Sequence, residues 1–67
     1  MKPDWKGAPD WAKWLAQDYN REWWWYENQP CKLKADYEWR AGGKVRSVKK
    51  ENRNPNWKDT LEQRPEA

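Results

Sequence analysis

The side chains that carry most enzyme chemistry are scarce in this sequence. It contains no histidine, which removes the commonest general base and the commonest zinc ligand together. Cys31 has no histidine to activate its thiol, and Ser47 and Thr60 likewise lack a base. The sequence therefore predicts a protein that is not an enzyme and that holds no metal and no cofactor.

A basic segment in the second half of the chain could contact phosphates. Residues 1–31 carry four bases and five acids, whereas residues 32–67 carry ten bases and six acids. Aromatic rings interleaved with bases match the chemistry of single-stranded nucleic acid binding. No sequence motif for nucleic-acid recognition accompanies them, and a solvated charged surface is the alternative interpretation. The candidate nucleic-acid contacts are Trp39, Arg40, Lys44, Arg46, Lys49, Lys50 and Arg53.

The run Trp23-Trp24-Trp25-Tyr26 is the second candidate for function. Successive side chains of a strand point to opposite faces of a sheet. Trp23 and Trp25 are therefore expected on one face, and Trp24 and Tyr26 on the other. A small sheet usually buries one face only, so the second face needs its own explanation.

Three arrangements could cover the face that carries Trp24 and Tyr26. The two ends of the chain could fold over it through Trp5, Trp57 and Leu61, a second copy could cover it in a dimer, or a partner protein could bind there. Large aromatic rings beside bases are the residue types that dominate protein interfaces. The predicted partner-binding residues are Trp24, Tyr26, Lys44 and Arg46, which could lie on neighbouring strands with their side chains pointing the same way.

The supply of apolar residues limits the scaffold that positions these candidates. The chain of 67 residues is expected to form a single domain, residues 1–67, near the size at which one core only just stabilises a fold. It has three leucines, two valines and no isoleucine or phenylalanine, but eight tryptophans. Most of the tryptophans are therefore predicted to form the core.

The first half of the sequence indicates an arm followed by a hairpin. Residues 1–9 contain two prolines and a glycine, which indicate an extended arm pinned by Trp5. Residues 10–18 fit a helix or a strand, and we favour the strand because turn formers and an aromatic run follow. A hairpin over residues 11–28 would then begin a β-sheet region that spans residues 10–50.

The second half indicates two further β segments. A third strand is expected through residues 35–40, after which Gly42 and Gly43 turn the chain. The spacing of apolar residues over positions 44–50 breaks strict alternation, which indicates an edge strand with a bulge or a loop.

The end of the chain predicts a short helix over residues 54–64. Asn54 suits the N-cap and Pro55 the first turn, while Trp57 and Leu61 would share one face and dock on the sheet. The expected fold is therefore α+β and mostly β. It combines a small antiparallel sheet of three or four strands, a short C-terminal helix and a tryptophan-rich core.

Composition also bears on the compartment. No apolar run is long enough to span a bilayer, and the amino terminus lacks the pattern of a secretion signal. A single cysteine cannot form an intramolecular disulfide, which agrees with a reducing compartment. We expect a cytoplasmic protein that does not bind membranes.

Three stretches of the sequence have a distinctive pattern. They are DWKGAPDWAKWLAQD at residues 4–18, EWWWYE at residues 22–27 and NPNWKDTLEQRP at residues 54–65. In these stretches the chain resembles small proteins of tailed bacteriophages and prophages, in which the hairpin turn usually contains a glycine where Asn20-Arg21 stands here. The resemblance implies a phage product in the cytoplasm of a bacterial host, and it implies no catalytic residues.

These observations favour a binding function over a catalytic one. We expect an accessory protein that binds a host or phage protein and alters its activity, as a monomer or a homodimer. The alternatives are a small basic nucleic-acid-binding protein that uses residues 40–53 and a self-associating structural component.

Overall fold

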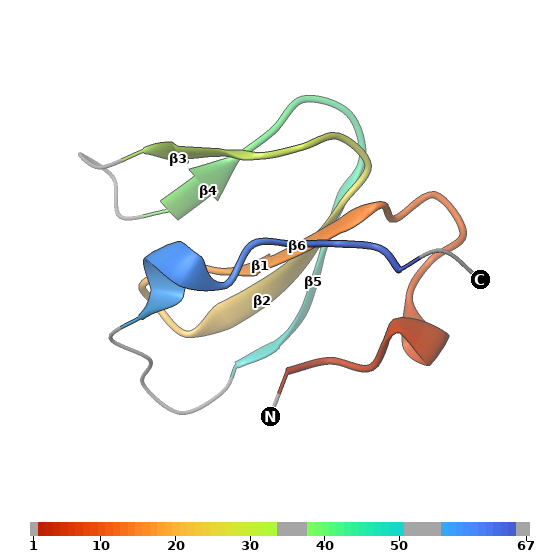
Figure 1. Cartoon of the computed structure of the whole chain (residues 1–67), viewed down its shortest axis with the longest axis horizontal. Coiled ribbons are helices and arrows are strands. Elements are labelled where there is room, and N and C mark those ends of the chain that lie inside the picture. The colour runs from red at the N-terminus through yellow and green to blue at the C-terminus, as the bar shows by residue number, and fades with distance from the viewer. Residues whose placement is uncertain (1, 34–37, 51–55, 66–67) are drawn as a thin grey trace.

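The computed structural model of the chain describes residues 2–33, 38–50 and 56–65. Within these residues the chain forms short strands and single-turn 3-10 helices, with no α-helix (Figure 1). Four strands form an antiparallel sheet in the order β5-β2-β1-β6, and β3 pairs with β4 separately. In chain order the elements are η1 (Trp5–Gly7), β1 (Trp14–Gln17), β2 (Glu22–Tyr26), β3 (Cys31–Leu33), β4 (Glu38–Arg40), β5 (Val45–Lys50), η2 (Trp57–Asp59) and β6 (Glu62–Gln63).

Strands β1 and β2 form the hairpin that the sequence predicts. They pair antiparallel, with Trp14 opposite Tyr26, so this segment is strand and not helix. The turn closes through a bond of 2.9 Å from the Arg21 amide to the Asp18 carbonyl. Arg21 has a φ of 77°, so it ends a three-residue loop in the left-handed conformation that glycine usually adopts there.

Strand β5 confirms the predicted edge strand with a bulge. It pairs antiparallel with β2, with Trp24 opposite Ser47 and Trp25 opposite Arg46. The register shifts between Glu22 and Trp24. The extra residue on the β5 side is the cause of the broken alternation in the sequence.

The predicted C-terminal helix is wrong for the part of residues 54–64 that the structure describes, because positions 54–55 lie outside it. The chain makes only the single turn η2 and then strand β6, which pairs with β1. The Thr60 hydroxyl accepts a bond of 2.8 Å from the Gln17 amide, and the Arg64 amide donates to the Lys13 carbonyl at 2.7 Å. Pairing with β1 thus gives hydrogen-bond partners to backbone groups of this segment. A helix of two turns would leave most of its N–H and C=O groups without partners, because they lie at its ends.

The predicted third strand is present, but it lies outside the main four-stranded sheet. Strand β4 covers the end of the predicted range 35–40, and positions 35–37 lie outside the described residues. It pairs with β3, a strand that no sequence pattern indicates, and Cys31 lies opposite Arg40. Figure 1 shows this hairpin on one side of the main sheet and the amino-terminal arm on the other.

The core is divided between the two faces of the sheet, and tryptophan dominates both halves. Ala12, Leu15, Trp23 and Trp25 form one buried cluster, against which Trp5, Ala8 and Trp11 pack. Ala16, Tyr26, Trp39 and Trp57 form the other, against which Trp14, Trp24, Ala41 and Leu61 pack. Trp57 and Leu61 therefore cover the expected face, but Trp5 covers the opposite one. The structure thus gives both faces of this small sheet a cover made from the chain's own residues.

The amino-terminal arm is held by its tryptophan and by a carboxylate of β6. The ring of Trp5 packs on that of Trp25 with centroids 4.7 Å apart. The Trp5 ring N–H and the Lys2 ammonium both donate hydrogen bonds to Glu62. The bond from Lys2, followed by that from Trp5, lowers the pKa of Glu62 below its ordinary value of 4.5.

We expect this carboxylate to make the stability of the fold depend on pH in acid. Because the folded pKa of Glu62 is lowered, its contribution is complete above the unfolded value of 4.5 and is lost as the pH falls through the folded pKa. The contribution is under about 1 kcal/mol, since the pair is solvent-exposed. The difference in melting temperature between the native protein and Glu62→Gln should therefore shrink between about pH 6 and about pH 3. A difference that stays constant over this range contradicts the assignment.

Candidate functional site

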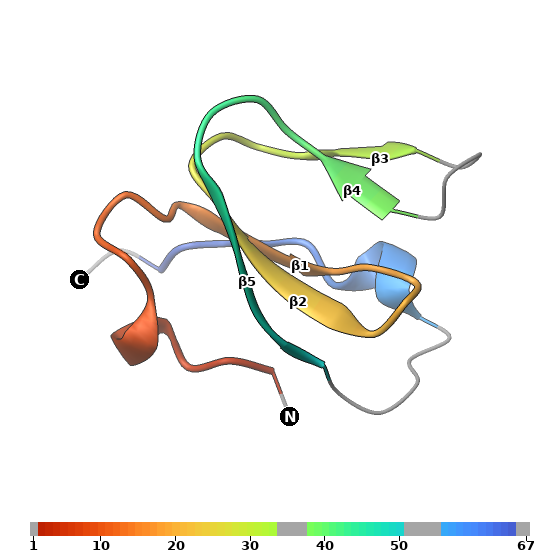
Figure 2. The ribbon, with the colours of Figure 1, turned by 180° about the vertical axis from the view of Figure 1, so that it is seen from behind.

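Strand β5 lies at an edge of the main sheet (Figure 2). Its six residues are all exposed. Among the residues that the structure describes, it pairs with β2 and with no strand on its other side. Val45 is 44% exposed and Val48 is 38% exposed, so this strand presents two apolar side chains to solvent. An edge of this kind is a template for a further strand.

The turn before β5 sets its position against β2, and the predicted Gly42-Gly43 turn is confirmed. Gly43 has a φ of 81°, and a Cβ there would meet the Asn28 side-chain nitrogen at 2.5 Å. Asn28 donates a hydrogen bond of 3.0 Å to the Gly42 carbonyl. The Lys44 amide donates to the Glu27 carboxylate at 3.2 Å, and the Glu27 amide donates to the Lys44 carbonyl at 3.0 Å. Glycine suits this turn, because any other residue would be strained at this φ and its Cβ would displace the Asn28 and Glu27 side chains.

The bond between Glu27 and Lys44 also shows which β5 amides face outward. Residue pairs in an antiparallel ladder alternate between those that exchange backbone bonds and those that do not. The Glu27 amide donates to the Lys44 carbonyl, so these two residues form a hydrogen-bonded pair. The pair of Trp25 with Arg46, two positions along the same register, is therefore hydrogen-bonded too. The backbone N–H and C=O groups of Val45 and Ser47 therefore point away from β2, toward an added strand.

The exposed edge is basic. Lys44, Arg46, Lys49 and Lys50 lie within seven residues that include no acid. The Arg46 guanidinium lies 5.9 Å from the centre of the Trp11 ring, which positions it over the arm side of the sheet. A partner that carries acidic residues would gain favourable electrostatic interactions along this strand.

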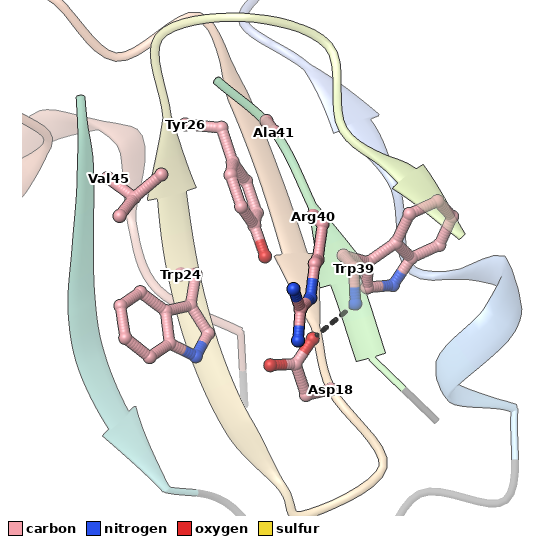
Figure 3. A pocket seen from close by; sticks show the side chains of 7 residues that line it. All are labelled: Asp18, Trp24, Tyr26, Trp39, Arg40, Ala41 and Val45. Atoms are coloured by element: carbon pink, nitrogen blue, oxygen red, sulfur yellow. Dashed lines mark hydrogen bonds between the residues drawn. The ribbon is translucent and has the colours of Figure 1, made fainter. Parts of the chain in front are cut away.

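A pocket of about 220 Å³ opens beside Val45 on the face that β3–β4 covers. Figure 3 shows the Tyr26 hydroxyl and the Arg40 guanidinium pointing toward the Asp18 carboxylate. Asp18 accepts a hydrogen bond of 2.9 Å from the Trp39 backbone amide. The pocket is lined by Asp18, Trp24, Tyr26, Trp39, Arg40, Ala41 and Val45. We call it the Trp24 pocket.

The Trp24 pocket contains a buried donor that no other described group satisfies. The ring nitrogens of Trp23, Trp24 and Trp39 are buried and have no hydrogen-bond partner among the residues described. In Figure 3 the Trp24 nitrogen faces the interior of the pocket, whereas the Trp39 ring points away from it. A buried donor without an acceptor is costly, so a movement of the Trp24 ring that brought this nitrogen to an acceptor atom in the pocket would be favoured.

A second pocket, of about 260 Å³, lies beside Val48 on the opposite face. Its walls come from the arm and the sheet, and it is lined by Pro3, Asp4, Gly7, Trp25, Val48 and Lys49. We call it the Val48 pocket. Strand β5 thus has one pocket on each of its faces, each beside an exposed valine.

The predicted partner-binding residues do not form one surface. Trp24 and Tyr26 share a face as expected, but Tyr26 is only 3% exposed and belongs to the core. Arg46 lies opposite Trp25 in the register, so it points to the other face, and Lys44 shares that orientation by alternation. The expectation that all four point the same way is wrong, because β2 and β5 pair one residue out of the assumed phase.

The predicted nucleic-acid contacts are also divided. Trp39 is 8% exposed and packs edge-on against Trp57, so it offers no free ring to a base. Arg40 lines the Trp24 pocket, and Arg53 lies outside the described residues. The remaining candidates, Lys44, Arg46, Lys49 and Lys50, lie on or next to β5.

Sequence reasoning missed the role of Asp18. In the sequence, Asp18 has the character of a turn residue. In the structure its side chain is buried and holds the β3–β4 hairpin to the main sheet. A single turn residue gives no signal for a bond to an amide 21 positions away.

The described residues contain no group of three or more histidine, cysteine, aspartate or glutamate side chains that could hold a metal ion. No described helix is long and apolar enough to cross a membrane. Comparisons of the chain with protein-family models, curated proteins and solved structures find no match.

Proposed function

We propose that this chain is a phage accessory protein that binds an extended, acidic segment of a host or phage protein along strand β5 and thereby alters that protein's activity. The observation that carries the proposal is the exposed edge of β5, where the amides of Val45 and Ser47 point outward between basic side chains. Strand addition of this kind uses main-chain hydrogen bonds for affinity and side-chain contacts for specificity. The phage assignment is supported by the resemblance of residues 4–18, 22–27 and 54–65 to phage proteins.

Charge favours an acidic partner over a second copy of the chain. Pairing of two β5 strands would bring two sets of lysine and arginine side chains next to one another, and like charges on adjacent strands are destabilising. An acidic segment would place opposite charges in the same positions. The same bases that discourage self-association therefore select the partner.

Nucleic-acid binding is the second candidate, because the basic side chains of residues 44–50 are exposed together. The burial of Trp39 removes the ring that this candidate assigned to base stacking. Phosphate contacts alone would give weak binding that falls steeply with salt.

Replacing Ser47 with proline tests the proposal. Proline removes an outward-facing amide and leaves the bonds between β5 and β2 in place, so the fold should persist. We expect the tagged variant to capture its partner from infected bacteria at least about tenfold less efficiently, with nuclease present throughout. Ser47→Ala is the matched control, since it removes the hydroxyl but keeps the amide, and it should capture normally.

Circular dichroism of both variants shows whether they are folded. If folded Ser47→Pro captures the same partner as Ser47→Ala, the edge is not the binding site. The native protein is also tested without nuclease, and capture that occurs only in the absence of nuclease favours the nucleic-acid function instead.

A further inference from the structure

The two pockets beside β5 lie at positions that a bound strand would reach with alternate side chains. Val45 belongs to the Trp24 pocket and Val48 to the Val48 pocket. Residues three apart on a strand point to opposite faces and are separated by about 10 Å. A strand added beside β5 has the same repeat, so two of its side chains three positions apart would lie beside the two pockets.

We propose, resting on the function proposed above, that the pockets select a partner segment in which a tyrosine and a branched aliphatic residue stand three positions apart among acidic residues. Each pocket has room for one large side chain, because an apolar cavity of about 150 Å³ already accommodates benzene. The volumes here are about 220 Å³ and about 260 Å³.

The Trp24 pocket is the site for tyrosine. Trp24, Ala41 and Val45 give it apolar walls that suit an aromatic ring, and Asp18 and Arg40 add polar groups. The Trp24 ring N–H is shielded from solvent and lacks an acceptor among the described residues, so binding includes a small rotation of the ring that brings this donor to the phenol oxygen. Phenylalanine would fill the same space and leave that donor unsatisfied.

The Val48 pocket is the site for the aliphatic side chain. Pro3, Gly7, Trp25 and Val48 give it mostly apolar walls. The three tryptophans whose buried ring nitrogens lack a partner do not line this pocket. A side chain that binds here therefore needs no hydrogen-bond acceptor. A leucine or isoleucine fits this chemistry, and its burial against Trp25 is the source of affinity.

Synthetic acidic peptides labelled with a fluorophore test the pattern by fluorescence anisotropy against the whole protein. One pair of peptides carries tyrosine and leucine three positions apart, in the two possible orders, because the direction of the added strand is part of the question. We expect one order to bind at least about tenfold more tightly than a peptide with the same residues two positions apart. Replacing the tyrosine with phenylalanine should weaken binding about threefold to tenfold.

The variant Trp24→Phe removes the ring N–H while keeping an aromatic side chain in the pocket. It should bind the tyrosine and phenylalanine peptides equally, whereas the native protein prefers tyrosine. Val48→Glu should weaken the binding of the peptide that carries leucine. The fold should remain intact because Val48 is exposed, as circular dichroism can verify.

The outcomes separate this inference from the proposed function. If all acidic peptides bind equally and Ser47→Pro abolishes their binding, the edge binds strands but the pockets do not select side chains, and the inference is overturned. If no peptide binds and capture of the partner does not respond to Ser47→Pro, both are overturned. A preference for tyrosine that persists in Trp24→Phe overturns the assignment of the Trp24 pocket.

Discussion

Replacing Trp25 with alanine is expected to lower the free energy of unfolding by about 3–5 kcal/mol, most of the stability of a domain this small. Trp25 is 3% exposed and is clustered with Ala12, Leu15 and Trp23. Its ring also supports that of Trp5 in the arm. Truncation therefore leaves a cavity in one half of the core and removes the surface against which the arm packs.

Urea unfolding followed by far-ultraviolet circular dichroism measures this loss. Tyr19→Ala is a suitable control, because Tyr19 is 50% exposed and its truncation should cost about 1 kcal/mol or less. Native tryptophan emission should be blue-shifted and should move to longer wavelength in Trp25→Ala. A loss of stability no larger than that of Tyr19→Ala would show that the arm-side cluster is not a core.

Replacing Asp18 with alanine should loosen the β3–β4 hairpin and cost about 1–3 kcal/mol. The Asp18 carboxylate accepts from the Trp39 amide at 2.9 Å, and that amide is buried. Alanine would leave this buried amide without its acceptor. The Trp39 ring lies edge-on to Trp57 at 6.5 Å between centroids, so displacement of the hairpin would also disturb the C-terminal cover.

Amide hydrogen exchange at Trp39 reports on this bond directly. We expect exchange to accelerate strongly in Asp18→Ala and less in Asp18→Asn, which keeps a side-chain oxygen able to accept the bond. Equal protection of the Trp39 amide in the native protein and in Asp18→Ala would mean that the hairpin is held by packing alone.

Local patterns predicted the first hairpin and the edge strand correctly. The aromatic run at residues 22–26 and the preceding turn formers require few long-range contacts to specify a hairpin. Arg21 shows the limit of that information, because its φ of 77° is imposed by the closing bonds of the loop and not by its own preference.

The C-terminal segment shows where local patterns are insufficient. Residues 54–64 have the composition of a capped helix, but a helix of two turns is marginal and depends on what it packs against. Strand β1 has a free side in the hairpin, and Glu62–Gln63 pair with it. The available edge of β1 outweighs a weak helical preference, and no sequence pattern within residues 54–64 contains that information.

The candidate site, too, is only partly predictable from local sequence. The amino-acid types alone indicate a tryptophan core, a basic edge and the absence of histidine-based chemistry, because these follow from composition and short spacing. Which side chains meet at a pocket depends on register, and a shift of one residue between β2 and β5 moves every side chain to the other face. That register, together with the fold of β3–β4 over Trp24, is a property of contacts between distant segments, and it places Arg46 and Trp24 on opposite faces of one strand pair.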